Sequence, residues 1–323
     1  MIWAVLAHQP VGCDSAGMNP TLSVTGSGGV ALNTRVAGDL TMPTIVLVHG
    51  YPDTGAVWEE MTADLQRRFH VIRPDVRGAG ASDRPTDTAS YRIEHLIGDL
   101  GAVIDATSPS RPVHLVGHDW GSIQSWSALT DPIVGPRIAS YTSISGPCLD
   151  HVSQWLPRGS HAASRRDVFR QARRSWYVAA FQVPGAGLPW KLGLARRFPK
   201  VLERLEGIAP TAHHRAPTLA DDARAGIKLY RANVRSRRRS PQPPTITTPV
   251  QLLVPLHDPF VTPSLADAAL PWCTNLWRRE IDAGHWAIRS HASEVAGYVS
   301  ELVDAVESDR APVGQHRMID DSV

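Results

Sequence analysis

The stretch VHLVGHDWGSIQSW, residues 113–126, decides the fold. It opens as a short apolar run of the kind that forms a buried strand, and it closes with the apolar spacing of a helix. Between the two lies the pentapeptide GHDWG at 117–121. Its two glycines permit the strained backbone of a sharp strand-to-helix turn, which exposes the residue at its centre. The stretch therefore predicts a nucleophile at that centre, Asp119.

A carboxylate at this position suits a particular chemistry. Asp119 needs no deprotonation before it attacks carbon, and the attack yields an alkyl ester that water can hydrolyse later. The structural alternative is that Asp119 is a solvated residue of an ordinary turn between two glycines.

Strand-like runs alternate with helical segments along the chain. This alternation predicts an α/β fold with a mostly parallel central sheet flanked by helices. The runs at 44–49 and 250–255 are continuously apolar, as central strands buried on both faces are. The other expected strands lie at 29–36, 70–75, 113–118, 140–145 and 275–281, and helical spacing is clear at 58–69 and 93–107.

A long interval without strand-like runs separates 140–145 from 250–255. It is rich in Arg, Ala, Trp and Pro, and we interpret it as an inserted, mainly helical cap or lid. The expected organisation is a core formed by 22–147 and 246–306, a cap at 148–245, and flexible tails at 1–21 and 307–323.

Composition excludes several classes of protein. The chain has 323 residues and a formal net charge of +2, so nothing in its total charge favours nucleic acid as the main partner. Its three cysteines, at positions 13, 148 and 273, are too few and too scattered for a disulfide framework. The apolar run at 1–7 is too short to span a membrane. We therefore expect a cytoplasmic protein.

The small total charge hides an uneven distribution. Residues 151–240 hold 19 Lys and Arg but 5 Asp and Glu, a net charge of +14, whereas the remainder carries −12. One interpretation is a solvated, arginine-rich surface that docks on an acidic domain. The other is that the basic cap guides anionic amphiphiles, or makes weak contact with a lipid surface.

Two later segments complete a candidate triad with Asp119. The expected strand at 250–255 is followed by LHDP with Asp258, and the strand at 275–281 by DAGHW with His285. Open α/β sheets place their sites just beyond the carboxyl ends of strands. A single His or Asp there can equally be a cap or turn residue, but the order nucleophile, acid, base matches a hydrolase triad.

The segment HGYPD at 49–53 follows another buried strand. There the backbone N–H groups of Tyr51 and Trp120 are placed to form an oxyanion hole. A tight structural turn is the alternative, and Asp53 is interpreted as a turn residue.

These motifs, with RGAGASD at 77–83, resemble the epoxide hydrolases of the α/β-hydrolase superfamily over residues 22–305. The resemblance implies two cap tyrosines that hold the epoxide oxygen. Tyr177 in SWYVAAFQVP and Tyr230 in LYRAN match their motifs, although both could simply fill the core of the cap. Trp176 and Phe181 would belong to an apolar substrate pocket.

The resemblance implies a two-step reaction that needs no metal ion and no organic cofactor. Asp119 attacks an epoxide carbon while Tyr177 and Tyr230 donate to the leaving oxygen. His285, oriented by Asp258, then activates a water that releases a vicinal diol. The partners would be a small-molecule epoxide and water, in detoxification or lipid epoxide metabolism. The chain would act as a monomer or a homodimer.

Two other functions stay open. A haloalkane-type dehalogenase shares the fold and the Asp nucleophile, and Trp120 could bind its halide, although Tyr51 stands where those enzymes have Asn. A non-catalytic binding protein would need a broken triad, which the sequence does not show. Relatives of this type can be joined to a reductase domain, but without a second fingerprint we expect no reductase activity.

Overall fold

The computed structural model describes residues 12–13, 20–156, 161, 163–208, 217–239, 243–310 and 316–317. Its strands form one sheet in the order β1-β2-β3-β5-β4-β6-β7-β8-β9-β10. The strands are β1 (Gly12–Cys13), β2 (Pro20–Thr25), β3 (Ala31–Ala37), β4 (Thr44–Val48), β5 (His70–Pro74), β6 (Val113–His118), β7 (Ile138–Ile144), β8 (Val250–Pro255), β9 (Leu276–Ile281) and β10 (His316–Arg317).

The centre of the sheet is parallel and its edges are antiparallel. The six neighbours from β5 to β9 run parallel, while β1, β2, β3 and β10 pair antiparallel. The predicted α/β fold with a mostly parallel sheet is confirmed. All seven expected strands are present, and β2, which the sequence analysis did not include, adds a strand at residues 20–25.

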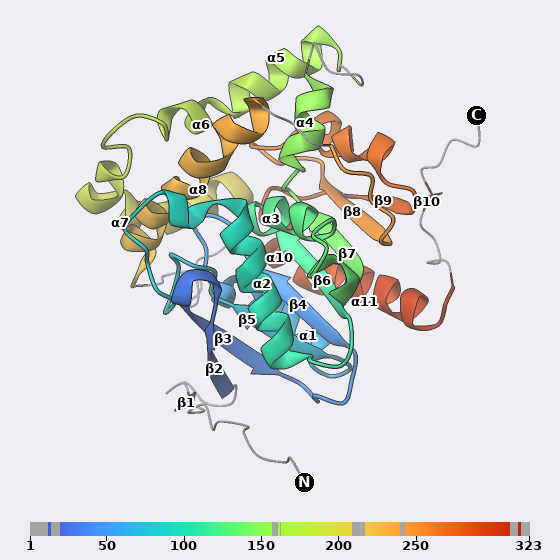
Figure 1. The fold of residues 1–323 in the computed structure, drawn as a ribbon. Helices are drawn as coiled ribbons and strands as arrows, with labels where there is room; N and C mark the ends of the chain where they lie inside the picture. The colour runs from blue at the N-terminus through green and yellow to red at the C-terminus, as the bar shows by residue number, and fades with distance from the viewer. Residues whose placement is uncertain are drawn as a thin grey trace.

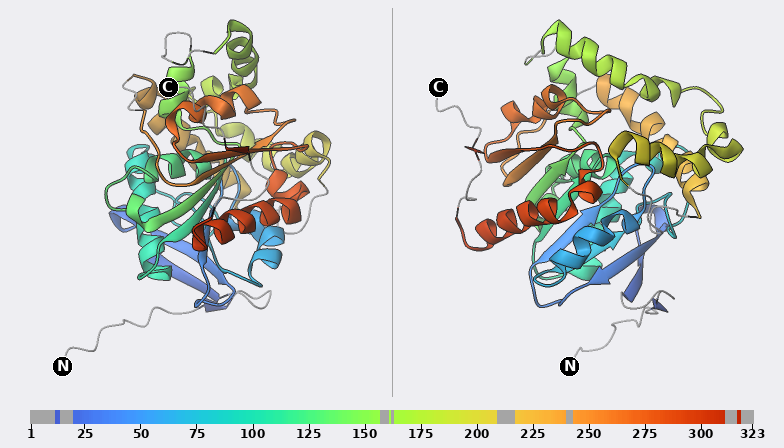
Figure 2. Two further views of the ribbon diagram at one scale, coloured as in Figure 1. Left: turned by 90° about the vertical axis from the view of Figure 1, so that its right-hand side faces the viewer. Right: turned by 180° about the vertical axis from the view of Figure 1, so that it is seen from behind.

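Helices cover both faces of this sheet (Figures 1 and 2). The flanking helices are α1 (Glu59–Leu65), α2 (Ile93–Thr107), α3 (Trp120–Ala128), α9 (Pro263–Ala266), α10 (Ala287–Ser290) and α11 (Ala292–Glu307). Single-turn 3-10 segments lie at 27–29, 55–58, 89–91 and 135–137, and a longer one lies at 267–272.

The central strand β4 divides its apolar side chains between the two faces. Val46 and Val48 pack in one cluster with residues of α2 and α3. Ile45 and Leu47 pack in the other cluster with residues of α1 and α11. This alternation follows the two-residue period of a strand and explains why the run at 44–48 is apolar throughout.

In the described part of the segment between β7 and β8, which is predicted to be the cap, the structure contains five α-helices (Figure 1). They are α4 (Leu149–Trp155), α5 (Arg165–Arg174), α6 (Trp176–Ala180), α7 (Ala195–Glu206) and α8 (Leu219–Arg239), with a π-helical turn at 190–194. The boundaries at 148 and 245 stay predictions. Across the described ranges, the structure contains no helix with the length and hydropathy of a membrane span.

The predicted tails at 1–21 and 307–323 lie largely outside the described residues. Of the first tail, β1 and the start of β2 are described, so the sheet begins before residue 22. Of the second tail, 307–310 and β10 are described.

Candidate active site

Asp119 lies at the turn between β6 and α3, as the sequence predicts. Its backbone has φ 52° and ψ −121°, a positive φ that non-glycine residues rarely adopt. Close packing requires the glycines beside it: a Cβ on Gly117 would lie 2.6 Å from Ser122 Cα, and one on Gly121 would lie 2.0 Å from the Val48 carbonyl oxygen. Strain at a tightly packed turn is a common feature of functional sites.

The segment after β4 lies against the carboxylate of Asp119. The backbone N–H of Tyr51 donates to Asp119 Oδ1 at 2.7 Å. The His49 side chain fixes this segment, because its Nε2 accepts from the Val76 N–H and its Nδ1 lies 3.0 Å from the Gly50 carbonyl oxygen. The N–H predicted to stabilise an oxyanion therefore already binds a carboxylate oxygen.

The predicted acid and base meet beyond the ends of β8 and β9, two adjacent strands. His285 Nδ1 lies 2.8 Å from Asp258 Oδ2, and both side chains are buried. Asp258 Oδ1 accepts from the backbone N–H groups of Phe260 and Val261 at 2.7 and 2.9 Å. His285 Nε2 lies 3.8 Å from Asp119 Oδ2, which is beyond hydrogen-bond distance. The structure thus brings the three predicted triad residues together.

Burial and mutual charge shift the pKa values of all three groups. Burial raises the pKa of Asp119 to about 6, although His285 and the backbone N–H groups of Tyr51 and Trp120 oppose this shift. Burial alone would lower the pKa of His285, but Asp258 and Asp119 outweigh it and raise that pKa to about 9. Burial opposes ionisation of Asp258, yet His285 holds its pKa below the usual range. The free site therefore favours two carboxylates around an imidazolium.

His118 is a neighbour of His285, the predicted base. Its Nε2 lies 2.9 Å from the His285 carbonyl oxygen, and the two rings are 4.8 Å apart between centroids. Complete burial, and then the charge of His285, lower the pKa of His118 to about 3. A neutral ring donates its Nε2–H to that carbonyl and so supports the loop that carries His285.

The two tyrosines of the predicted cap lie near Asp119, with which both interact electrostatically. Tyr230 on α8 contacts Trp120 with ring centroids 4.9 Å apart, and Tyr177 on α6 lies 5.9 Å from Tyr230. Phe260 packs between Tyr177 and His285, at centroid distances of 5.5 and 4.9 Å. Burial, followed by the charge of Asp119, raises the pKa of both phenols well above the usual range. Both phenols therefore stay protonated and keep an O–H donor.

Helix α8, which carries Tyr230, makes polar contacts with the core through Asn233 and Asp222, among others. Asn233 Oδ1 accepts from the Ile93 N–H at 2.9 Å, and its Nδ2 donates to the Tyr91 carbonyl oxygen at 2.8 Å. Near the start of α8, Asp222 forms an ion pair with Arg84 at 2.6 Å. These contacts hold α8, and with it Tyr230, against the core.

The structure separates the two residues predicted to line a substrate pocket. Phe181 packs against Tyr230 and Tyr51, with centroid distances of 4.9 and 5.4 Å. Trp176 instead is 69% exposed, so its assignment to the pocket is wrong. Helical geometry explains the difference: Tyr177 and Phe181 are four residues apart and share one face, whereas position 176 turns away from it.

Two carboxylates near the base were not among the predicted site residues. Asp53 is half-buried and accepts from the Trp286 indole N–H at 2.8 Å, and burial raises its pKa. It is therefore more than a turn residue. Glu206 on α7 accepts from the backbone N–H groups of His285 and Trp286. Their signals in the sequence were weak, because Asp53 resembles a turn residue and Glu206 lies in a helix of mixed polarity.

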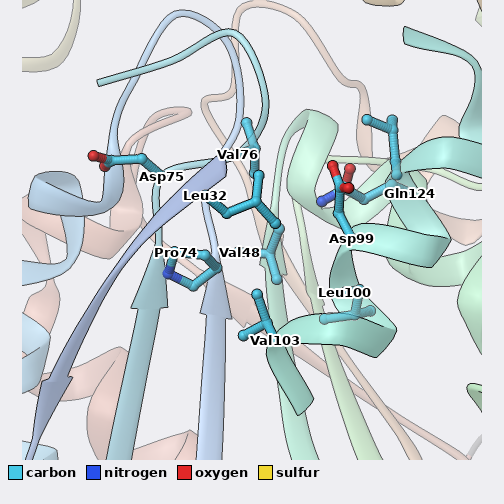
Figure 3. Close-up of a pocket in the computed structure, with 10 residues that line it drawn as sticks. Leu32, Val48, Pro74, Asp75, Val76, Asp99, Leu100, Val103 and Gln124 are labelled. Atoms are coloured by element: carbon cyan, nitrogen blue, oxygen red, sulfur yellow. The ribbon is translucent and has the colours of Figure 1, made fainter. Parts of the chain in front are cut away.

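A cavity elsewhere in the core is not this site (Figure 3). It holds about 20 Å³, room for about one water molecule. Its lining residues are Leu32, Val48, Pro74, Asp75, Val76, Leu96, Asp99, Leu100, Val103 and Gln124, and none of the predicted site residues is among them. Asp99 there is engaged by Arg77, at 2.6 Å from both Nε and Nη2.

Comparison with known proteins identifies the family. The family model described as alpha/beta hydrolase fold matches residues 43–292. "Probable oxidoreductase EphD" of Mycobacterium tuberculosis is 36% identical over 305 residues, which cover 90% of this chain and 51% of that protein. "Epoxide hydrolase A" of the same species is 32% identical over 168 residues, covering 51% of this chain and 49% of that protein. The chain thus spans about half the length of these curated relatives.

Solved structures show the same fold at low sequence identity. An epoxide hydrolase from Bacillus megaterium, an F128A mutant complexed with its diol product, superposes with a TM-score of 0.72 at 20% identity. The alignment covers 87% of this chain and 99% of that one. Since the family model alone matches more than half of the sequence, the chain belongs to the α/β-hydrolase-fold family.

Proposed function

We propose that the protein is an epoxide hydrolase that opens an epoxide to a vicinal diol through a covalent ester on Asp119. One observation carries the proposal: a buried carboxylate, bound by the Tyr51 N–H, lies under two protonated phenols and beside a His–Asp pair. The names of the relative epoxide hydrolase A and of the solved structure support the same reaction class.

In the first step the carboxylate of Asp119 attacks an epoxide carbon and the C–O bond of the ring breaks. The leaving oxygen takes a proton from the phenol of Tyr177 or Tyr230, and solvent later restores that proton. The product is a hydroxyalkyl ester of Asp119. Each phenol is protonated in the free site, because burial and the charge of Asp119 keep its pKa above the usual range, so an O–H donor is present when the alkoxide develops.

In the second step a water attacks the carbonyl carbon of the ester. His285 takes a proton from the water, and the N–H groups of Tyr51 and Trp120 stabilise the oxyanion. Collapse of the tetrahedral intermediate releases the diol, which takes the proton back from His285. The carboxyl group of Asp119 keeps the second proton of the water and loses it to solvent, which restores the carboxylate. Because His285 Nε2 lies 3.8 Å from Asp119 Oδ2 and forms no hydrogen bond with it, Nε2 can accept a hydrogen bond from that water.

The charges of the site explain why the base acts only in the second step. His285 must be neutral to act as a base, yet the charge of Asp119 is one cause of its raised pKa in the free protein. Esterification removes that charge, so the pKa of His285 falls once the first step is complete. The base thus becomes available when it is needed.

A dehalogenase is the second candidate, and one observation favours it. The indole Nε1 of Trp120, adjacent to the nucleophile, is buried beside Tyr230, the phenol with which its N–H interacts. Such a donor suits a halide as well as an epoxide substituent. A non-catalytic binding protein is disfavoured, since it would have no use for an assembled triad.

Product analysis on both substrate classes tests the proposal. The purified chain is incubated with styrene oxide, an aliphatic epoxide and an epoxy fatty acid, and in parallel with small haloalkanes. We expect diol from an epoxide, no halide release, and no diol with Asp119→Ala. Halide release without diol would establish the dehalogenase, and neither product from any substrate would count against both.

We further propose that the basic cap guides anionic amphiphiles or contacts a lipid surface. The support is its charge together with exposed apolar side chains between Arg and Lys residues, a composition typical of interfacial segments. These side chains are Phe169, Trp176, Val183, Leu188, Leu192 and Val201. Cytoplasmic location and a monomeric or homodimeric state stay predictions.

A further inference from the structure

The carboxylate of Glu206 reaches from the cap segment to the loop that carries the base. Its Oε1 accepts from the His285 N–H at 3.1 Å, and its Oε2 accepts from the Trp286 N–H at 3.2 Å. Glu206 is the last residue of α7. A negative side chain at a helix C-terminus is unfavourable for the helix, because it faces the negative end of the macrodipole. The contact with the base loop, not helix formation, accounts for a carboxylate here.

Helix α7 presents one continuous face to this loop. Phe198, Leu202 and Glu206 are spaced by four residues and therefore share that face. The ring of Phe198 lies 6.2 Å from that of Trp286, and Leu202 is buried in the same apolar cluster. The two hydrogen bonds of Glu206 thus lie at the end of a helix face that packs against this loop.

The loop is shaped to receive this carboxylate. A Cβ built on Gly284 would lie 2.0 Å from Glu206 Oε2, and its three nearest atoms all belong to the Glu206 side chain. The φ of Gly284 is outside the positive range. An alanine at 284 would therefore force the Glu206 side chain to move, whereas the backbone conformation of Gly284 would accept an alanine.

Glu206 also contributes to the charge around His285. The negative groups that raise the pKa of this histidine are Asp258, Asp119 and Glu206. Asp53 and His118 interact electrostatically with His285 as well, and Arg289 is a cationic neighbour of Glu206. After Asp119 is esterified, Glu206 is one of the remaining anions that act on the base.

We propose that Glu206 is a positioning residue that holds the His285 loop for the ester-hydrolysis step and ties the position of the base to the docking of α7. The inference rests on the proposed function, because it assigns Glu206 to the second step of that reaction. Glu206 does not touch the reacting atoms. Its loss should therefore slow hydrolysis of the ester and leave formation of the ester nearly unchanged.

Single-turnover kinetics on three variants test this assignment. Ester on the protein is followed by intact mass and diol by product analysis, from pH 5 to pH 9. In Glu206→Gln and Glu206→Ala we expect ester hydrolysis to slow about tenfold while ester formation changes less than twofold. Glu203→Gln is the matched control, since it removes the same charge from an exposed position one turn earlier on α7.

The pH dependence separates positioning from a general loss of structure. Ester hydrolysis needs neutral His285, so its rate rises with pH to a plateau. Removal of the Glu206 charge lowers the pKa of His285, and the rise should move to lower pH in Glu206→Gln but not in Glu203→Gln. A misdocked cap would instead slow ester formation too, because Tyr177 and Tyr230 would shift; that result would overturn the assignment.

A second pair of substitutions tests the contact itself. Gly284→Ala should slow hydrolysis about as much as Glu206→Ala does, and adding it to Glu206→Ala should change the rate less than twofold. Equal costs of Gly284→Ala in both backgrounds would overturn the assignment. A wild-type chain that forms neither ester nor diol would sink the proposed function. A wild type that turns over beside a Glu206→Gln variant indistinguishable from Glu203→Gln would sink only the inference on Glu206.

Discussion

In the proposed mechanism Asp119 must be ionised to attack, and its pKa of about 6 places that ionisation within an accessible pH range. We predict that the rate of ester formation falls about tenfold for each pH unit below about 6. Intact-mass measurement of ester in single turnovers from pH 4.5 to pH 8 checks this. A flat rate across that range would show that carboxylate ionisation does not limit the first step.

His285 favours the ionised form of Asp119, and in the proposed mechanism it also acts as the base of the second step. In His285→Gln we predict that ester accumulates to about one equivalent and that diol formation falls at least about 10³-fold. The cationic ring that lowers the pKa of Asp119 is then absent, so the fall in ester formation should begin at a higher pH than in wild type. Normal turnover by this variant would remove His285 from the mechanism.

At the scale of elements, α8 and α2 depend on each other through Asn233. Its Oδ1 accepts from the N–H of Ile93, which is the first residue of α2 and one of the donors that a helix leaves unpaired. We predict that Asn233→Ala lowers the free energy of unfolding by about 1–2 kcal/mol, as loss of a helix cap does. Urea unfolding measures the change, with Ser236→Ala on the same helix as control. Equal stability of the two variants would contradict the capping role.

The sequence patterns predicted helices and strands well, but they predicted the contacts between these elements poorly. Continuous apolar runs identified β4 and β8, and the glycines around Asp119 identified the turn. Strand β2 was missed because it is half exposed and buries little apolar surface. Glu206 and Asn233 were missed because their partners lie 79 and 140 residues away, and no local pattern reports such distances. Trp176 was misassigned because a sequence gives its neighbours but not its helix face.

At the scale of the whole molecule, buried neutral histidines set a limit on acid stability. Burial lowers the pKa of His118 to about 3 and that of His151 to about 4, below the value of about 6.5 expected in the unfolded chain. Their contribution is present above pH 6.5 and is lost as pH falls. We predict a loss of about 1.4 kcal/mol per pH unit for each histidine between pH 6 and pH 4. Urea unfolding of wild type and His151→Gln checks this prediction. The free energy of unfolding of the variant should fall less steeply as the pH is lowered from 6 to 4.

The uneven charge of the chain leads to a prediction about salt. If the cap, with a net charge of +14 over residues 151–240, guides anionic substrates, kcat/KM for an epoxy fatty acid should fall several-fold between 20 and 300 mM salt. The value for styrene oxide, which is neutral, should change less than twofold. Equal responses of the two substrates would leave a solvated surface as the only role of this charge.

Substitution of exposed aromatic side chains distinguishes contact with a lipid surface from electrostatic guidance of dissolved anionic substrates. Phe169 and Trp176 are 66% and 69% exposed and lie seven residues apart on α5 and α6, with Arg173 between them. We predict that Phe169→Ser with Trp176→Ser lowers co-sedimentation with anionic vesicles about tenfold, since two large apolar side chains lose contact with the bilayer. Ile133→Ser, which removes an apolar side chain 80% exposed on the core, should leave it unchanged.

Hydrolysis of styrene oxide should stay at the wild-type rate in both variants, because neither surface reaches Asp119. Binding to neutral and anionic vesicles alike, or to neither, would mean that the basic cap does not select a charged lipid surface.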